Sequence, residues 1–328
     1  MELINIGFLT PILAGMKEAG INLYPHIKKS GLSIYNLDNM GGYIPMNMAN
    51  DLLDGVCHQQ GIDDVASLFS ERIGIASLSQ YGELITASPS VYCATQIAIK
   101  NSQAILTNEQ LSLSIDNGVA KFSQEFKNLN PIEYKHIVSI NFAYLLQGFS
   151  LSLGGNWLPT EIHSQINSIP DLSNIYDDFN QINVKLNQTE TALIFKLVDL
   201  SKPLAKINPL LDVNLNDKEL NIIGATCKVD KLIDSYTLEN TPNFKNICHQ
   251  VGVPERTLRR QLIEEGTSFS EILANWRYVK GISFLENEKL SIKEISQKLH
   301  YSNDSNFMRA FKKTTGLSPS KFREVMIK

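Results

Sequence analysis

The sequence predicts an α+β N-terminal domain followed by an all-α C-terminal domain with two helix-turn-helix units. Residues 241–328 contain short helical signals that occur twice with the same plan. Residues 1–240 add alternating runs of strand type between helical runs. Residues 241–328 hold 9 Lys and 6 Arg against 9 Asp and Glu, a net charge of +6, whereas residues 1–240 carry a net charge of −10. This asymmetry favours nucleic-acid binding at the C-terminal end only.

The chain of 328 residues is long enough for two or three domains. We expect the α+β domain to cover residues 1–215 and a linker helix with a hinge to cover residues 216–240. The basic all-α domain then covers residues 241–328.

Proline positions predict the helices of the first domain. Proline is favoured in the first turn of a helix, because the N–H that it lacks has no helical partner there. Helices are therefore expected to open at Thr10-Pro11, Tyr24-Pro25, Ile44-Pro45 and Ser88-Pro89. A further helix is expected over residues 131–154, where helical periodicity returns after a change of pattern.

The change of pattern is a predicted β-hairpin. Asn117-Gly118 lies between two alternating runs, which is typical of a type I′ turn. A two-residue loop pairs Leu113 with Phe122 and places both on an apolar face. Further strands are expected within residues 159–166, 182–186 and 193–197, followed by an irregular exit over residues 200–209.

The first helix-turn-helix unit is expected to begin at Thr241-Pro242, with Thr as the cap and Pro at the first helical position. The second helix of this unit covers residues 254–264, and Leu258 and Leu262 mark its buried side. Three arginines at spacing i, i+3 and i+4 lie on the other side, which is more positive charge than solubility requires. They are Arg256, Arg259 and Arg260.

The second unit begins with a capping box, since Ser291 and Glu294 form the pattern S-x-x-E. A second helix follows the turn and ends at Gly316. Its side opposite the phenylalanines carries short polar side chains, a methionine and an arginine, which suit a reader of the DNA major groove. These residues are Asn303, Asp304, Ser305, Asn306, Met308 and Arg309.

The segments GVPERTLRRQLIEEGTSFSEIL and ISQKLHYSNDSNFMRAFKKTTGLSPSKFR resemble the double helix-turn-helix domain of AraC/XylS-type transcription regulators over residues 241–328. The pieces GGYIPM, YGELITASPSVYCA and DLSKPLAKINPLL resemble the long arabinose-binding-type N-terminal domain of one subgroup. Two positions depart from the family pattern. His300 replaces a turn glycine, so that this turn must accommodate a Cβ, and Pro254 replaces a capping serine.

The resemblance implies that the second helix of each unit binds DNA. Each arginine could read a base or touch a phosphate, and Asp304 could accept from cytosine or simply favour the helix dipole. Arg309 could equally be structural. Lys312 and Lys313 could contact phosphates or be solvated. The expected DNA-binding residues are Arg256, Thr257, Arg259, Arg260, Asp304, Ser305, Asn306, Met308, Arg309, Lys312 and Lys313.

The sequence gives no support for an enzyme, a cofactor or a metal site. It contains no P-loop, no G-x-S-x-G, no H-E-x-x-H and no dinucleotide fingerprint. The four cysteines are scattered, and the six histidines lack metal-ligand spacing. The N-terminal apolar run is broken by Pro11 and lacks a basic leader, so we expect no signal peptide, no membrane contact and a cytoplasmic location.

The expected function is that of a sequence-specific DNA-binding transcription regulator, an activator by family habit. A small effector or dimerisation through residues 1–215 would control it. The expected partners are double-stranded DNA, RNA polymerase as the family implies, an unknown small-molecule effector and a second copy of the chain in a homodimer. The alternatives are a ligand-independent dimeric repressor and an architectural DNA binder with no sensing role.

Overall fold

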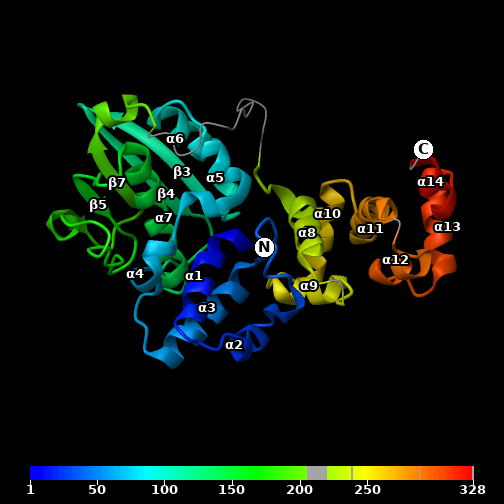
Figure 1. Ribbon diagram of the computed structural model, residues 1–328. Coiled ribbons are helices and arrows are strands. Elements are labelled where there is room, and N and C mark those ends of the chain that lie inside the picture. The colour runs from blue at the N-terminus through cyan, green and yellow to red at the C-terminus, as the bar shows by residue number, and fades with distance from the viewer. Residues whose placement is uncertain (205–219, 238, 288, 327–328) are drawn as a thin grey trace. The chain divides into compact units, whose positions relative to one another are not determined.

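The computed structural model describes residues 1–204, 220–237, 239–287 and 289–326 (Figure 1). The chain divides into two compact units. The N-terminal unit consists of Glu2–Ser33 and Leu37–Ile223, and the C-terminal unit consists of Met1, Ile34–Asn36 and Gly224–Lys328. Residues 205–209 of the predicted exit and residues 216–219 of the predicted linker lie outside the described residues.

Helices of the N-terminal unit cover one face of an antiparallel hairpin. Helices α5, α6 and α7 contribute apolar side chains to the hairpin face that carries Leu111 and Phe122. The ring of Phe149 on α7 lies 5.2 Å from Phe122 and 5.0 Å from Phe195, between ring centroids. The helices are α1 Ile6–Glu18, α2 Tyr24–Lys29, α3 Met46–Gln60, α4 Val65–Phe69, α5 Ser79–Thr86, α6 Val91–Lys100 and α7 Lys135–Leu153.

The strands among the described residues form two sheets. A small antiparallel pair joins β1 Leu3–Asn5 to β2 Tyr43–Pro45. The larger sheet has the order β3-β4-β7-β5-β6, in which only the β5–β6 pair is parallel. Its strands are β3 Glu109–Asp116, β4 Val119–Phe126, β5 Glu161–His163, β6 Asn183–Lys185 and β7 Thr191–Lys196.

The predicted hairpin is confirmed in its turn and in its register. Asn117 and Gly118 have φ angles of 49° and 79°, as a type I′ turn requires. Leu113 pairs with Phe122, and Ile115 pairs with Ala120. The strands expected within residues 159–166, 182–186 and 193–197 are present as β5, β6 and β7. An α+β unit is therefore followed by an all-α one, as the sequence predicts.

Side-chain caps, not prolines, set the first residue of several helices. Helix α1 begins at Ile6, because Asn5 Oδ1 accepts from the backbone N–H of Gly7 at 2.9 Å, and Pro11 lies inside the helix. Helix α6 begins at Val91, after Ser90 as cap. The predicted start at Thr10-Pro11 was therefore wrong by more than one helical turn, and the start at Ser88-Pro89 was wrong by two residues. The strands β1 and β2 were missed, because three buried residues show no period.

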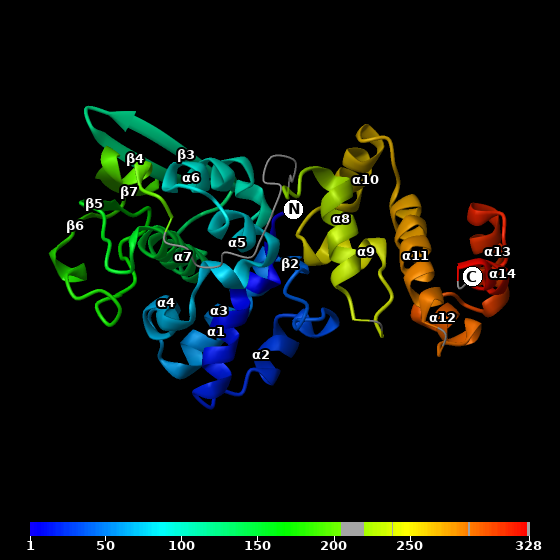
Figure 2. The same cartoon turned by 45° about the horizontal axis from the view of Figure 1, so that its top comes forward.

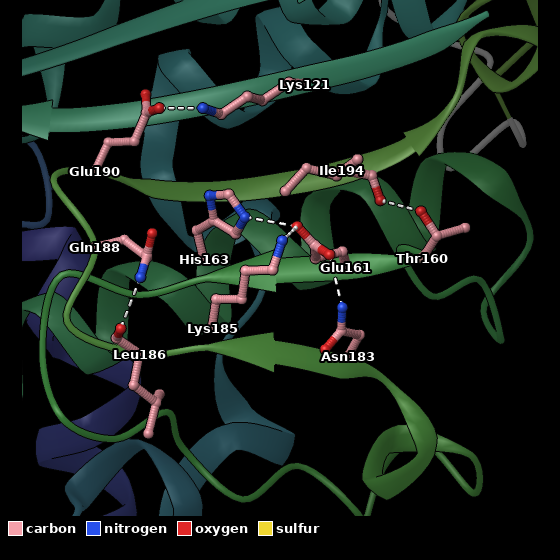
Figure 3. Close-up of polar contacts among 10 residues, drawn as sticks. All are labelled: Lys121, Thr160, Glu161, His163, Asn183, Lys185, Leu186, Gln188, Glu190 and Ile194. Carbon is pink, nitrogen blue, oxygen red and sulfur yellow. Dashed lines mark hydrogen bonds and ion pairs between the residues drawn. The ribbon is translucent and has the colours of Figure 1, made fainter.

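Charged side chains link the strands on the polar face of the larger sheet (Figure 3). Glu161 on β5 accepts from His163 at 2.7 Å and from Lys185 on β6 at 2.8 Å. These hydrogen bonds, first from Lys185 and then from His163, lower the pKa of Glu161. Lys121 on β4 forms an ion pair with Glu190 beside β7. One group ties β5 to β6 and the other ties β4 to the residue before β7, and both suit a structural role on a solvated sheet face.

The C-terminal unit is helical. Helix α11 lies between the α8–α10 group and the α12–α14 group in both views (Figures 1 and 2). Residues 34–36 add a strand-like bridge to this unit, in which Tyr35 pairs with Tyr236. The helices are α8 Gly224–Ser235, α9 Phe244–Gln250, α10 Glu255–Glu264, α11 Phe269–Glu286, α12 Ile292–Lys298, α13 Asp304–Thr315 and α14 Pro319–Met326. No helix in the described part of the chain is long and apolar enough to cross a bilayer.

Candidate nucleic-acid interface

Helices α9 and α10 form the first helix-turn-helix unit. Asn243 caps α9, since its Oδ1 accepts from the backbone N–H groups of Lys245 at 3.0 Å and Asn246 at 3.3 Å. The expected start at Thr241-Pro242 was therefore wrong, and the helix begins at Phe244. Helix α10 begins at Glu255, after Pro254 in the cap position and without a side-chain cap, as the departure from the family pattern predicts.

The arginines of α10 lie in three different environments. Arg256 is exposed, and no described residue forms a hydrogen bond or ion pair with it. The guanidinium of Arg259 lies 4.9 Å from the centre of the Phe244 ring, a cation–π contact that ties α10 to α9. Arg260 lies 3.7 Å from Glu264, and both side chains are largely exposed, so this pair is weak. Thr257 is half-buried.

Helix α11 connects the two helix-turn-helix units and holds the turn of the second one. Arg277 donates from Nε to the backbone oxygen of Leu299 and from Nη2 to that of His300, both at 2.9 Å. The guanidinium also lies 4.6 Å from the centre of the Tyr301 ring. His300 has a φ of 56°, so a Cβ occupies the left-handed region here. Burial and then the charge of Arg277 lower the pKa of His300, which favours a neutral ring beside the guanidinium.

Helices α12 and α13 form the second unit, and the predicted capping box is confirmed. Ser291 Oγ accepts from the backbone N–H of Glu294 at 3.1 Å, and Glu294 accepts from the backbone N–H of Ser291 at 2.8 Å. Asn303 caps α13, and Gly316 ends it with a φ of 77°. Phe307 and Phe311 are buried, so the opposite side of α13 faces outward.

The outward side of α13 carries most of the predicted site residues of this unit. Arg309 donates from Nη2 to Asn306 Oδ1 at 2.6 Å, and Asn306 donates to Ser302 Oγ at 2.7 Å. This chain of hydrogen bonds orients the guanidinium along the helix surface. Asp304 is half-buried in the first turn, where a carboxylate favours the helix dipole. The remaining site residues are exposed: Ser305, Met308, Lys312 and Lys313.

Two arginines outside the predicted site support these helices. Arg323 on α14 donates to the backbone oxygens of Leu285 at 3.0 Å and Leu290 at 2.8 Å, which fixes the end of α11. Arg277 supports the turn in the same way. Neither role was predicted from the sequence, because an arginine that binds distant backbone carbonyls leaves no local pattern. The roles of Arg277 and Arg323 become visible only in the structure, where α11 and α14 pack on the second helix-turn-helix unit.

One side-chain group in the N-terminal unit resembles a nucleophile with its base. Cys57 Sγ lies 4.0 Å from His136 Nδ1, and His136 Nε2 lies 3.5 Å from Asp54. Burial, and then the charge of Asp54, raise the pKa of Cys57 to about 12, so the thiol stays protonated. The group therefore lacks an activated thiolate. No group of three or more His, Cys, Asp or Glu suited to a metal ion occurs among the described residues.

Residues 247–324 match the helix-turn-helix domain family. An uncharacterised HTH-type transcriptional regulator of Mycobacterium bovis is 37% identical over 81 residues, which are 25% of this chain and 24% of the relative. The ornithine utilization regulator of Pseudomonas aeruginosa is 21% identical over 330 residues, 98% of this chain and 97% of that protein. The crystal structure of the transcriptional regulator CdpR from the same organism has a TM-score of 0.41 and 16% sequence identity, and covers 96% of this chain and 97% of that chain.

The matched region contains both helix-turn-helix units described above. The chain spans 24% of the length of each of two mycobacterial relatives and 48% of the Pseudomonas aeruginosa regulator VqsM. The match begins within α9 and ends within α14, and it includes the outward sides of α10 and α13. Residues 247–324 thus form an AraC-type helix-turn-helix domain.

Proposed function

We propose that this protein is a sequence-specific DNA-binding transcription regulator that uses the outward sides of α10 and α13. The observation that supports this most strongly is the presence of two helix-turn-helix units within one compact unit, each with a cationic outer helix side. The charge of +6 over residues 241–328 adds a general attraction to phosphates. Specificity would come from side chains that reach base edges.

The environments of the site residues favour different roles. Arg256 is exposed and without a described partner, so it is the best candidate for a bidentate contact to guanine. Arg259 is engaged with Phe244 and suits a phosphate contact that also positions α10. In α13, Arg309 presents an oriented guanidinium beside Asn306. Lys312 and Lys313 lie in the last turn and suit phosphate contacts. We assign Thr257, Arg260, Asp304, Ser305 and Met308 to the same surface.

We further propose that the N-terminal unit controls this activity. Residues 1–215 would sense a small effector or dimerise, residues 216–240 would transmit the change, and residues 241–328 would bind DNA. Family habit favours an activator that acts with RNA polymerase, as a homodimer in the cytoplasm. We propose that this chain is a member of the subgroup with a long arabinose-binding-type N-terminal domain.

Selection of bound sequences from a random duplex pool at physiological salt tests the proposal. We expect the full-length protein to recover one sequence pattern that covers two successive major grooves, which are about 34 Å apart. The variant Arg256→Ala/Arg260→Ala should lose this preference. A matched control is Lys28→Ala/Lys29→Ala, which removes the same charge from exposed residues of the N-terminal unit. Recovery of the same pattern by the arginine variant would remove the assignment of α10 as a reading helix.

There are two alternative functions. One is an architectural DNA binder with no sensing role, and the other is a ligand-independent dimeric repressor. The acidic residues 1–240, with a net charge of −10, argue against an architectural role, because they add no DNA affinity. Binding without any preferred sequence would favour the architectural protein. A preferred sequence whose affinity no small molecule changes would favour the ligand-independent repressor.

A further inference from the structure

The N-terminal unit contains a cavity beside the β3–β4 hairpin. Side chains of α5, α6 and α7 close it against the apolar face of the two strands. Its volume is about 60 Å³. The walls are mostly aliphatic and aromatic, and they include Ile85, Ala94, Leu111, Phe122, Leu145 and Phe149.

One acidic side chain lies in this apolar wall. Glu109 is the first residue of β3 and faces the same side as Leu111 and Leu113, since strand residues alternate. Its side chain is buried, with 4% of the residue exposed. Burial raises the pKa of Glu109 to about 7, although hydrogen bonds from Asn141 and Gln124 oppose the shift. A buried carboxyl costs stability, and an apolar residue at this position would avoid that cost.

The two hydrogen bonds to Glu109 leave one of its oxygens available. Asn141 on α7 donates to Oε1 at 2.9 Å, and Gln124 on β4 donates to the same oxygen. No described residue donates to Oε2. Asn141 Oδ1 and the hydroxyl of Tyr81, which also line the cavity, have no described hydrogen-bond partner either. The polar end of the cavity therefore offers two acceptor oxygens and a hydroxyl.

The charges of the lining residues limit what could bind. Neither Lys, Arg nor His is among the described residues that line the cavity. An anionic group would therefore meet Glu109 without a compensating cation, and its burial would be costly. A donor such as a hydroxyl or an amine would instead satisfy Glu109 Oε2, and its apolar part would contact the walls.

We propose that this cavity binds a small, largely apolar molecule through one hydrogen-bond donor, a hydroxyl or an amine, that bonds to Glu109 Oε2. The proposal builds on the sensing role proposed above for the N-terminal unit and adds the site and the ligand chemistry. The volume of the cavity limits the size of the ligand. For comparison, an engineered cavity of about 150 Å³ in another protein accepts benzene. A cavity of about 60 Å³ holds the donor group and a short alkyl chain without rearrangement.

Ordered water is the competing occupant. Water occupies about 30 Å³ in the liquid and needs two to four polar partners, which the polar end of the cavity can supply. Water would satisfy Glu109 and leave the cavity as a part of the core. The two explanations differ in whether a donor-bearing alkyl compound binds saturably and whether an anionic one fails to do so.

The test uses the full-length protein labelled with ¹⁵N and three small probes of equal chain length, ethanol, ethylamine and acetate, at pH 8. We expect saturable amide shifts in α5, α6 and β3 with the alcohol and the amine and no saturable shifts with acetate. Saturable binding of acetate with equal affinity, or the absence of saturable binding by all three probes, would overturn the proposal.

Glu109→Gln is the matched variant, because it keeps the oxygen that accepts from Asn141 and Gln124 and replaces Oε2 by a donor. The affinity for the alcohol and the amine should fall by about tenfold or more. The acceptor-only probe acetone should bind Glu109→Gln more tightly than it binds the unmodified protein. Glu125→Gln, an exposed change on β4, is the control and should leave all affinities unchanged. Unchanged alcohol and amine affinities in Glu109→Gln would also overturn the proposal.

A second variant addresses the walls of the cavity. Ala98→Leu on α6 fills the space with apolar atoms and should abolish the binding of both donor probes. Selection of DNA sequences with the same protein samples separates the two proposals. Probes that fail to bind a protein that still selects its sequence would remove the ligand site alone. Donor probes that bind a protein without DNA preference would remove the regulator proposal alone.

Discussion

Arg277 and His300 are joined by a hydrogen bond from the guanidinium to the backbone oxygen, at 2.9 Å. The same guanidinium bonds the oxygen of Leu299, so one side chain of α11 satisfies two carbonyls in the turn of the second unit. His300 adopts a left-handed conformation that few side chains favour. We infer that Arg277 compensates for a turn residue with a Cβ and keeps α13 at its angle to α12.

Arg277→Lys should destabilise the C-terminal unit by roughly 1.5–3 kcal/mol, because an ammonium group cannot bond both carbonyls in the fork geometry of Arg. The protein has two tryptophans, Trp157 and Trp276. In a Trp157→Phe background, the fluorescence of Trp276 in urea reports the unfolding of this unit. Arg260→Lys, at an exposed site, is the control and should stay within about 0.5 kcal/mol. Equal effects of the two changes would contradict the role of Arg277.

His300→Val should cost roughly 1–2 kcal/mol in the same measurement, because a β-branched residue is disfavoured at a φ of 56°. His300→Gly should change the stability by less than about 1 kcal/mol. The relief of strain offsets the higher backbone entropy of the unfolded chain and the loss of the hydrogen bond between His300 and Thr241. A Gly variant less stable than the Val variant would show that side-chain contacts, not backbone strain, dominate at this turn.

Lys312→Ala/Lys313→Ala should reduce the salt dependence of DNA binding. If both lysines contact phosphates, the slope of log affinity against log salt falls by about 1.8, since each contact contributes about 0.9. Filter binding to the selected sequence between 50 and 200 mM salt, on the order of physiological ionic strength, measures the slope. Preference among sequences should stay the same, because phosphate contacts carry no base information. An unchanged slope would mean that both lysines are solvated in the complex.

Glu109 should make the N-terminal unit less stable as the pH rises from about 4.5 to about 7. In this window the unfolded carboxyl has lost its proton and the folded one still holds it, so the free energy of unfolding falls with increasing pH. The difference between the pKa values corresponds to about 3 kcal/mol. Glu109→Gln removes this contribution and should be more stable than the unmodified protein at pH 8, with a smaller advantage at pH 4.5. Urea unfolding followed by Trp157 fluorescence in a Trp276→Phe background measures the stability of both proteins at each pH. An equal advantage of Glu109→Gln at the two pH values would contradict the prediction.

Local chemistry made part of the structure predictable. The Asn117-Gly118 turn and the Ser291–Glu294 capping box are determined by neighbouring residues, and the structure confirms both. Proline alone was a weaker guide, because Asn243 provides two hydrogen bonds that move the start of α9 away from Pro242. Glu109 carried no signal in the sequence, since a carboxyl at the end of a strand is ordinarily exposed. Its burial depends on helices distant along the chain.

The segment Ile34–Asn36 has a practical consequence for chimeric regulators. Tyr35 donates to Gln250 at 2.8 Å, and Asn36 donates to the backbone oxygen of Ser235 at 2.8 Å, although these partners lie some two hundred residues apart in the chain. A transplant of residues 224–328 alone would leave Tyr236 and Gln250 without Tyr35. Exchange of this DNA-binding module between proteins therefore requires a host that supplies an equivalent tripeptide, or a donor fragment fused to one. The module is not a contiguous cassette.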